Sequence, residues 1–485
     1  MEMVEVLKNY INGEWVESKG TKTLDVVNPA TLEVLAKVPL STKEDVDDAV
    51  KAAKEAFWEW RSTPPLTRAR YLFELRNLLE AHFEEISEIV VKEHGKVLDE
   101  ARGEVRRAIE NVEVAAGIPS LMMGYNSEDV APGIDEICIR QPLGVCCILA
   151  PYNFPAMVPL WFLPYAVACG NTVIVKPSSQ VPLTMKRIME LVDEVGFPPG
   201  VINLVNGSRE VSNALLENRD VKAVSFVGST PVALHVYKKA AETGKRAQCQ
   251  GGAKNYLVIM PDADLKGTIP ALITSACGCT GQRCLAGSIF VAVGEIYEPL
   301  KKALVEAASK IKVGYGLDEG VQMGPLAFKE QYEKVLYYIN KGVEEGAKLL
   351  LDGRNIKVPK YPNGYFIGPT IFDEVTPEMT IAKEEIFGPV MGIMRVNTLD
   401  EAIELINKLP YGNASSIFTK NGKWAREFTY RVEAGNVGIN LGIAAPVAFF
   451  PFSGWKDSFF GDLHAQGMDC VEFFTQKKVV ITRWF

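Results

Sequence analysis

The chain has 485 residues, 47% of them hydrophobic and 23% charged, so it can bury more than one core and is expected to form two domains with smaller excursions. Its formal net charge of -8 argues against a surface for duplex nucleic acid. The N-terminus lacks an apolar signal-peptide core, the most apolar run (158–168) is broken by prolines, and the nine cysteines have no short regular spacing, which together predict a cytoplasmic protein without a membrane span or a disulfide framework.

The opening part of the chain is predicted to combine short strands with long helices. The segments 10–16 and 34–38 have an extended pattern, and amphipathic helices follow from 43 to about 117. Two further segments, 121–139 and 471–484, have the pattern of strand-rich excursions that leave the compact core. Because exposed strand edges are often covered by a partner subunit, these segments predict a homo-oligomer.

Two long regions alternate between short β-branched runs and helical patterns. The first predicts strands at 137–149, 172–175, 201–205, 223–227 and 256–260, and helices at 182–195, 211–217 and 232–243. The second predicts strands at 289–293, around Ile367 and Ile393, and at 416–419, and helices at 298–311, 329–345, 399–409 and 423–433. Such alternation is typical of an α/β fold with two doubly wound, mostly parallel sheets. Ligands of these sheets bind at the carboxyl ends of the strands.

Three turns at predicted strand ends carry polar groups. Asn153 stands between prolines, where its side-chain amide either serves the turn or donates to an oxyanion. Lys176 and Ser179 follow a second strand. Gly228 and Ser229 follow a third and open a helix, whose N-terminus suits a phosphate or simply carries a capping residue. The usual dinucleotide fingerprint of three spaced glycines is absent.

The strongest candidate nucleophile is Cys284, which directly follows the cation Arg283 in the small, Gly-rich stretch 276–286. A neighbouring guanidinium favours the thiolate, which is the reactive form of cysteine. One alternative is a buried structural cysteine. The other is a metal site shared with Cys277 and Cys279, although the four scattered histidines supply no further ligand and the spacing matches no zinc motif.

Taken in order, these segments resemble the aldehyde dehydrogenase superfamily. The shared motifs are Asn-Phe-Pro, Lys-Pro-Ser, Phe-x-Gly-Ser-Thr, Gly-Gln-x-Cys and, within 383–390, Glu-Glu-Ile-Phe-Gly-Pro; the match runs from about Tyr10 to Phe485. The resemblance implies an NAD-binding domain, a catalytic domain and a small β oligomerisation flap with a C-terminal tail. These would comprise, respectively, 1–121 with 142–251, then 252–448, and 122–141 with 449–485. It also implies a homotetramer built as a dimer of dimers.

The resemblance assigns site residues as well. Cys284 would be the nucleophile, and Asn153 with the backbone N–H of Cys284 would form the oxyanion hole. The cofactor would be NAD, with NADP as an alternative, because Ser179 lacks the charge with which a Glu at this place repels a 2'-phosphate. The resemblance implies that Lys176 holds the adenosine ribose, that Gly228 and Ser229 lie under the pyrophosphate, and that Glu385 and Phe387 position the nicotinamide ribose and ring. It also implies that Phe154 and Ser179 belong to the cofactor site.

One departure from the general pattern points to a branch of the superfamily. Hydrolytic members usually carry a Glu that activates water where this chain has Gln250, and an amide cannot act as a general base. The stretches 119–124, 252–255 and 449–456 look like the methylmalonate-semialdehyde dehydrogenase branch, whose members pass the acyl group to coenzyme A while the substrate carboxylate leaves as CO2. The resemblance therefore implies oxidation of methylmalonate or malonate semialdehyde to propionyl-CoA or acetyl-CoA.

Such a substrate is an anion and needs a fixed positive charge. The resemblance assigns this role to Arg107 and Arg283, whose planar guanidinium groups can hold a carboxylate bidentately, while Arg106 is expected to face water. Two other interpretations stay open. One is a non-acylating NAD(P)-dependent dehydrogenase of another semialdehyde, such as succinate semialdehyde; the other is a non-catalytic binding or structural protein on the same fold.

Overall fold

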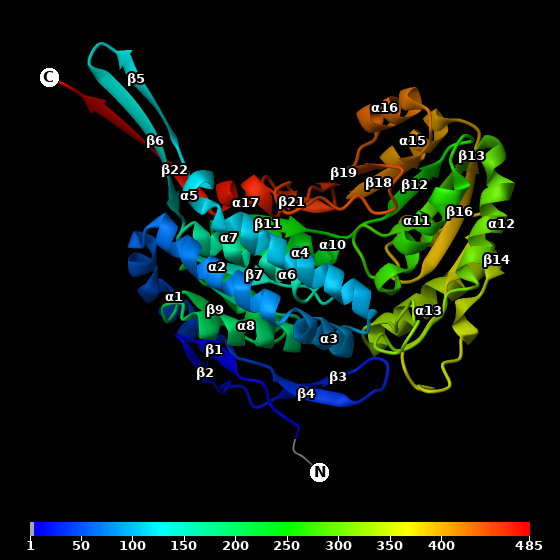
Figure 1. Cartoon of the computed structure of the whole chain (residues 1–485), viewed down its shortest axis with the longest axis horizontal. Helices are drawn as coiled ribbons and strands as arrows, with labels where there is room; N and C mark the ends of the chain where they lie inside the picture. Colours follow the sequence, from blue (N-terminus) through cyan, green and yellow to red (C-terminus); the bar gives the residue numbers. More distant parts are fainter. Residues whose placement is uncertain (1–3) are drawn as a thin grey trace.

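The computed structural model describes residues 4–485, and its largest element is a sheet of eight strands (Figure 1). Their order is β2-β1-β9-β8-β7-β10-β11-β21. The five central strands are parallel, and the edge strands β1, β2 and β21 run antiparallel to their neighbours. The strands are β1 (Asn9–Ile11), β2 (Glu14–Val16), β7 (Val145–Leu149), β8 (Thr172–Lys176), β9 (Ile202–Leu204), β10 (Val221–Val227), β11 (Arg246–Gln250) and β21 (Phe459–Gly461).

A second sheet has seven strands in the order β14-β15-β16-β13-β12-β18-β19. All neighbours are parallel except β14, which pairs antiparallel with β15 at one edge. The strands are β12 (Asn255–Ile259), β13 (Gly287–Val293), β14 (Lys348–Leu351), β15 (Thr370–Asp373), β16 (Val390–Val396), β18 (Ala414–Phe418) and β19 (Asn436–Ile439). The predicted α/β class with two doubly wound sheets is therefore confirmed.

The central strands of both sheets are covered on both faces, so that β7, β8 and β12 are buried along their whole length. In β7, Cys146 and Ile148 pack into one core cluster, whereas Val145, Cys147 and Leu149 pack into another. Because successive side chains of a strand point to opposite faces, these two clusters cover opposite sides of the sheet.

Helices cover these faces and connect the strands. They are α1 (Lys43–Ser62), α2 (Pro65–Ala81), α3 (Phe83–His94), α4 (Leu98–Ala116), α5 (Ile118–Leu121), α6 (Met157–Leu160), α7 (Leu163–Ala168), α8 (Leu183–Val195), α9 (Arg209–Glu217), α10 (Thr230–Glu242), α11 (Leu265–Cys277), α12 (Tyr297–Ala308), α13 (Lys329–Glu344), α14 (Thr380–Lys383), α15 (Leu399–Asn407), α16 (Gly422–Arg431) and α17 (Gly467–Phe473), with short 3-10 turns η1 (Gly278–Gly281), η2 (Gly294–Ile296) and η3 (Gly353–Asn355). Within the described residues, none of these helices is both long and apolar enough to cross a membrane.

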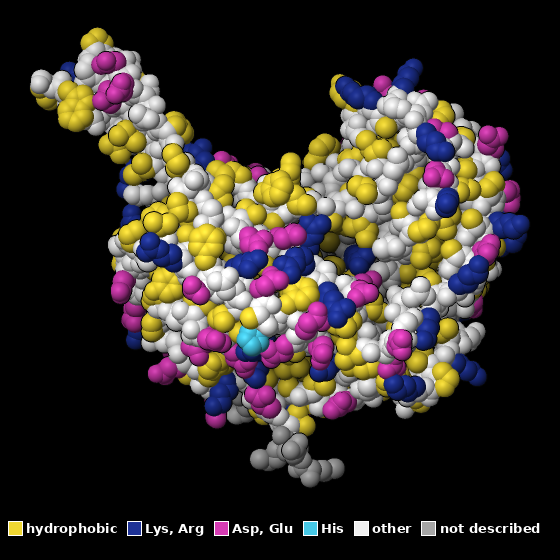
Figure 2. All heavy atoms as spheres, in the orientation of Figure 1, with side chains coloured by type: hydrophobic (Ala, Val, Ile, Leu, Met, Phe, Trp, Pro, Cys, Tyr) yellow, Lys and Arg dark blue, Asp and Glu magenta, His cyan; other side chains and the backbone are white. Residues whose placement is uncertain are grey.

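A three-stranded antiparallel sheet forms an arm that projects from the body (Figure 1). Figure 2 shows a broad notch between this arm and the part of the molecule that carries α15 and α16. The arm strands are β5 (Tyr125–Ala131), β6 (Ile134–Pro142) and β22 (Thr475–Arg483); two small antiparallel pairs complete the fold, β3 (Thr23–Val27) with β4 (Val34–Pro39) and β17 (Tyr411–Gly412) with β20 (Trp455–Lys456).

The structure differs from the predicted strands in several places. The expected strand 137–149 is two strands, because the chain turns between β6 and β7 at Gly144, whose φ of 136° suits glycine. The strand expected at 256–260 exists as β12 but belongs to the second sheet. The fifth strand of the first sheet is β11 instead, which was not predicted because its sequence, Arg-Ala-Gln-Cys-Gln, is polar.

The predicted flap and C-terminal tail segment 449–485 contributes to two sheets. β22 joins the arm, and β21 pairs with β11 and extends the eight-stranded sheet. Pairing with β21 satisfies backbone groups at the edge of β11. The domain boundaries stay predictions.

Candidate active site

A cavity of about 420 Å³ has Cys284 in its wall. Its wall combines one thiol, two guanidinium groups and several aromatic and aliphatic side chains. The lining residues are Asp99, Glu100, Gly103, Glu104, Arg107, Asn111, Phe154, Met157, Trp161, Thr274, Arg283, Cys284, Leu285, Ile443, Ala445, Pro446, Ala448, Phe452 and Gln466. A compartment of this composition suits a small anion that carries an apolar stem.

Hydrogen bonds to the main chain of Cys284 hold this residue at the cavity. Its carbonyl oxygen accepts hydrogen bonds of 2.8 Å from the side-chain amides of both Asn255 and Asn413. The preceding turn is tight, since a Cβ on Gly281 would lie 2.2 Å from the carbonyl oxygen of Gly388. Burial, together with the negative charge of Glu385, raises the pKa of the Cys284 thiol to about 12. The thiol is therefore protonated at neutral pH in the absence of a ligand.

Asn153 meets this segment directly. It lies in the turn after β7, it is buried, and its side-chain amide donates to the carbonyl oxygen of Gln282 at 3.0 Å. The Gln282 side chain is fixed in turn, because it donates to the carbonyl of Cys279 at 3.1 Å and accepts from the N–H of Ala327 at 3.1 Å. The amide of Asn153 is thus held within two residues of the thiol-bearing Cys284.

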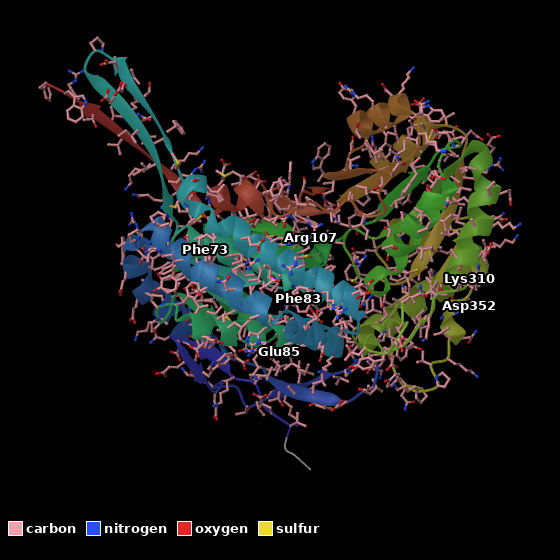
Figure 3. The ribbon with its side chains drawn as sticks, in the orientation of Figure 1. Phe73, Phe83, Glu85, Arg107, Lys310 and Asp352 are labelled. Carbon is pink, nitrogen blue, oxygen red and sulfur yellow. The ribbon has the colours of Figure 1, made fainter. Side chains whose placement is uncertain are left out.

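The two arginines differ in how firmly they are fixed. Arg283 is held within the wall, where Nε donates to Cys279 Sγ at 3.2 Å and Nη2 lies 3.3 Å from Glu100 Oε1. Arg107 has one partner in its own helix, Glu110, at 3.2 Å. Figure 3 shows Arg107 on α4, near the centre of the molecule. The two arginines are thereby brought to one cavity together with the thiol.

Carboxylates also line this cavity, but each has a cationic partner. Asp99 pairs with Arg102 at 3.1 Å and Glu100 pairs with Arg283, while Glu104 pairs with a buried lysine, Lys96, at 2.6 Å. Four lining residues follow one another along one face of α4 at intervals of four, three and four positions, namely Glu100, Glu104, Arg107 and Asn111. This spacing is that of a single helix face.

A second, smaller cavity of about 20 Å³ is shared by Cys284, Lys254, Glu385 and Phe387. Oε1 of Glu385 accepts from the N–H of Ala253 at 2.9 Å, and burial raises the pKa of this carboxyl group. Lys254 is buried without a hydrogen-bond partner in residues 4–485, and burial lowers its pKa to about 7. Phe387 has a left-handed φ of 62°. Glu385 and Phe387 thus share the wall of this smaller cavity with the thiol.

The remaining predicted cofactor residues lie at strand ends. Lys176 ends β8 and donates to the carbonyl of Pro177 at 2.8 Å, and burial lowers its pKa to about 8; Ser179 follows on the same turn. Gly228 and Ser229 connect β10 to α10. A Cβ on Gly228 would lie 2.5 Å from the ring of Phe226, and the side chain of Ser229 does not cap α10. The first N–H groups of α10 therefore stay available for an anion.

The strand order makes this edge a ligand site. From β7 the chain winds outward through β8 and β9 and then, in the other direction, through β10 and β11. In such sheets the crevice lies where the order reverses, between β7 and β10. Asn153 follows β7, and Gly228 follows β10. The geometry fits a dinucleotide whose pyrophosphate meets α10 and whose other end points toward Cys284.

Gln250 contacts a residue of the cavity wall. It ends β11, its side-chain Nε2 donates to the carbonyl of Phe452 at 2.9 Å, and its Oε1 has no hydrogen-bond partner in residues 4–485. Phe452 itself lines the large cavity. The side chain at position 250 is thus a neutral amide, which cannot activate water as a general base.

A family model described as "Aldehyde dehydrogenase family" matches residues 15–480. The chain belongs to the aldehyde dehydrogenase family. It is 53% identical over 481 residues to malonate-semialdehyde dehydrogenase 2 of Geobacillus kaustophilus and 52% identical over 480 residues to malonate-semialdehyde dehydrogenase of Halalkalibacterium halodurans, with 99% of each chain covered in both cases.

Solved structures agree with this membership. A methylmalonate-semialdehyde dehydrogenase from Oceanimonas doudoroffii superposes with a TM-score of 0.98 at 46% identity, covering 99% of both chains. A protein from Sinorhizobium meliloti 1021, described as a methylmalonate-semialdehyde dehydrogenase complexed with NAD, gives a TM-score of 0.98 at 43% identity, covering 100% of this chain and 99% of the other. The recognition of the aldehyde dehydrogenase family from sequence motifs is thereby confirmed.

Within the described residues, several of the aldehyde dehydrogenase motifs lie close together. Cys284, Arg107, Arg283 and Phe154 line one cavity, and Asn153 borders it through Gln282. Phe154, grouped with the cofactor residues from sequence, thus lies with the substrate-side residues. The alternative of a metal site at Cys277, Cys279 and Cys284 has no structural support. Between residues 4 and 485, no three His, Cys, Asp or Glu side chains are grouped as metal ligands would be. The individual roles stay predictions.

Sequence reasoning missed several residues of the aldehyde dehydrogenase site. Glu100 and Glu104 were not singled out, although their spacing from Arg107 along one predicted helix could have indicated a shared face. Trp161 and Phe452 reach the cavity from distant parts of the chain, and no local pattern signals such a meeting.

Proposed function

We propose that the protein is an NAD-dependent, CoA-acylating dehydrogenase of malonate or methylmalonate semialdehyde. The observation that carries this proposal is a single cavity that holds a thiol and two arginines, with an amide, Gln250, bonded to the main chain of one wall residue, Phe452. The similarity to malonate- and methylmalonate-semialdehyde dehydrogenases over nearly the whole chain supports the same substrate class.

The proposed chemistry begins at Cys284. Loss of the thiol proton to water gives the thiolate, which adds to the aldehyde carbon, while the side-chain amide of Asn153 and the backbone N–H of Cys284 donate to the developing oxyanion. Arg107 and Arg283 hold the substrate carboxylate, so that the aldehyde carbon lies over the sulfur. When bound, NAD supplies the acceptor for the hydride that leaves this carbon.

The binding of NAD is supported by the crevice between β7 and β10. The open N-terminus of α10 can donate to the pyrophosphate, and Gly228 lets it approach closely. Lys176 is proposed to hold the adenosine ribose, with Ser179 beside it, and Glu385 and Phe387 to position the nicotinamide end.

Release of the acyl group is proposed to need a second thiol. Loss of hydride leaves a thioester on Cys284, and Gln250 cannot deprotonate water to hydrolyse it. The thiolate of coenzyme A is a better nucleophile than water and needs less help from a base. It attacks the thioester carbonyl and displaces the Cys284 thiolate. The C–C bond to the substrate carboxylate breaks, CO2 leaves, and the carbon that held it takes up a proton from water, which gives acetyl-CoA or propionyl-CoA.

The test follows NADH, free acid and CoA ester during oxidation of malonate semialdehyde, methylmalonate semialdehyde and succinate semialdehyde. Without CoA we expect a burst of NADH close to one per active site followed by slow turnover, and with CoA a faster steady state that yields the CoA ester. Equal turnover with and without CoA, with free acid as the product in both, would favour the non-acylating alternative. Absence of reaction between Cys284 and a thiol reagent would favour the non-catalytic one.

We further propose that the protein acts as a homotetramer, a dimer of dimers. The arm leaves β5 and β22 as open edge strands and exposes apolar side chains, among them Ile137 of β6 and Val479 and Ile481 of β22. A second copy that covers this surface would satisfy both the strand edges and the apolar groups. Sedimentation of the full chain tests this assembly.

A further inference from the structure

A buried ion pair lies under the turn that carries the proposed oxyanion donor. Lys96, in the loop between α3 and α4, donates to Oε2 of Glu104 on α4 at 2.6 Å, and both side chains have 0% exposure. Because two charges removed from water lose their hydration, such a pair is a weak means of stabilising a fold. Its further hydrogen bonds show which part of the chain it holds.

Both charges reach the turn after β7. Nζ of Lys96 donates to the main-chain carbonyl of Asn153 at 2.7 Å and lies 4.1 Å from the centroid of the Phe154 ring. Oε1 of Glu104 accepts from the main-chain N–H of Ala156 at 2.8 Å and from that of the next residue at 3.3 Å. The start and the end of this turn are therefore tied to one ion pair.

The nucleophile segment is tied to the same helix. Glu100, one turn before Glu104 on α4, accepts from the main-chain N–H of Cys279 at 2.7 Å and from the Arg283 guanidinium at 3.3 Å. The turn that carries Asn153 and the segment that leads to the thiol are thus both fastened to neighbouring carboxylates of α4. Their separation is set by a rigid helix turn.

We propose that Lys96 and Glu104 are positioning residues, which hold the turn so that the Asn153 amide meets the substrate oxygen when Cys284 attacks. This inference rests on the oxyanion role proposed above for Asn153. A displacement of about 1 Å at a reacting group can cost about 10²-fold in rate. Loss of either charged partner should therefore lower the rate of hydride transfer, although neither residue touches the reacting atoms.

A double-mutant cycle tests the proposal in the full-length protein. Lys96→Met, Asn153→Ala and the double variant are compared in single-turnover NADH formation, with NAD binding, thermal melting and alkylation of Cys284 by iodoacetamide as further readouts. We expect Lys96→Met to slow hydride transfer by about tenfold to a hundredfold while NAD affinity and the alkylation rate stay within about twofold. In the Asn153→Ala background, Lys96→Met should cost nothing more.

A matched control and a second variant keep the outcome clear. Arg106→Met removes another cation near this site on α4, one that pairs with Glu80 at the surface at 2.7 Å, and should leave hydride transfer unchanged. Glu104→Gln, a change of similar shape, serves if Lys96→Met does not fold, and should show the same loss and the same non-additivity. Equal losses in both backgrounds, or a parallel fall in alkylation, would overturn the positioning role. An unchanged rate in Asn153→Ala alone would instead refute the oxyanion assignment.

Discussion

The side-chain amide of Asn153 donates to the carbonyl oxygen of Gln282 at 3.0 Å, two residues before Cys284. In this arrangement the amide satisfies the protein backbone while no substrate oxygen is present. A developing oxyanion is a stronger acceptor than a peptide carbonyl, so the same N–H group can transfer to it with little movement. This relationship links the turn after β7 to the chemistry at the thiol.

Removal of this amide should slow the chemical step without affecting cofactor binding. Asn153→Ala is expected to lower kcat by about 10²- to 10³-fold, as for other oxyanion donors, and Cys284→Ala should abolish oxidation of every aldehyde. NADH formation and the dissociation constant of NAD measure the two effects. An unchanged kcat would return Asn153 to a role in the turn alone, and turnover within about tenfold of the parent in Cys284→Ala would contradict the nucleophile assignment.

The carboxylate clamp predicts selectivity between aldehydes. Arg107→Leu should lower kcat/KM for malonate semialdehyde by roughly tenfold to a hundredfold, because a charge-assisted pair contributes ~1.5–3 kcal/mol. Oxidation of uncharged propanal should hardly change. Arg106→Leu, at the preceding position of α4, removes a surface ion pair with Glu80 and a contact with the Phe83 ring and should affect neither substrate. Equal losses for both aldehydes in Arg107→Leu would indicate a structural role.

Replacing Gln250 tests why coenzyme A is needed. Gln250→Glu cannot donate to the Phe452 carbonyl that now holds the amide, so the new carboxylate should turn away from that wall and reach water. CoA-independent release of free acid should then rise. Gln250→Leu also loses the hydrogen bond but supplies no base, and should show no such gain. If both variants hydrolyse the acyl-enzyme equally, base catalysis at this position is not the cause.

The reactivity of the Cys284 thiol should depend on the charge of the Glu385 carboxylate. Since burial and the charge of Glu385 raise the pKa of Cys284 to about 12, the rate of alkylation by iodoacetamide should keep rising with pH beyond the ~8.5 of a free cysteine. Glu385→Gln removes the negative charge, lowers the thiol pKa and should speed alkylation at a given pH. Glu384→Gln, in the exposed neighbouring position, is the control. Slower alkylation in Glu385→Gln would contradict this electrostatic coupling.

Cofactor choice should depend on Ser179. A carboxylate there can accept from the adenosine 2'-hydroxyl and repel a 2'-phosphate, whereas a serine cannot repel it. Ser179→Glu is therefore expected to raise the ratio of kcat/KM for NAD over NADP, while Ser179→Ala leaves the ratio near that of the parent. The argument fails if the glutamate variant has the parental preference.

Local sequence features were enough to predict most elements and the family. Alternation identified β8, β10 and the helices between them, and the motif around Cys284 identified the thiol. The alternation pattern could not assign β12 to its sheet, because it gives the order of strands along the chain but no information on which strands are neighbours in a sheet. The polar strand β11 was missed because its burial comes from strands on either side of it.

Prediction of the site residues from sequence meets the same limit. Arg107 and Arg283 were paired through resemblance, and the structure does bring them to one cavity. The buried contact of Lys96 with the Asn153 carbonyl spans 57 positions of the chain, and no periodicity or spacing connects residues so far apart. Such contacts depend on how α4 packs against the turn, which is a tertiary property.

The stripe of Glu100, Glu104, Arg107 and Asn111 along α4 has an evolutionary consequence. Each residue added to or removed from a helix turns everything beyond it by about 100°. A single insertion between Glu100 and Arg107 would therefore swing the arginine off the cavity while the carboxylate stayed in place, whatever residue was inserted. Homologous chains should tolerate length variation in the exposed turn between β5 and β6 but keep the register of α4 constant, even where its outward-facing residues diverge.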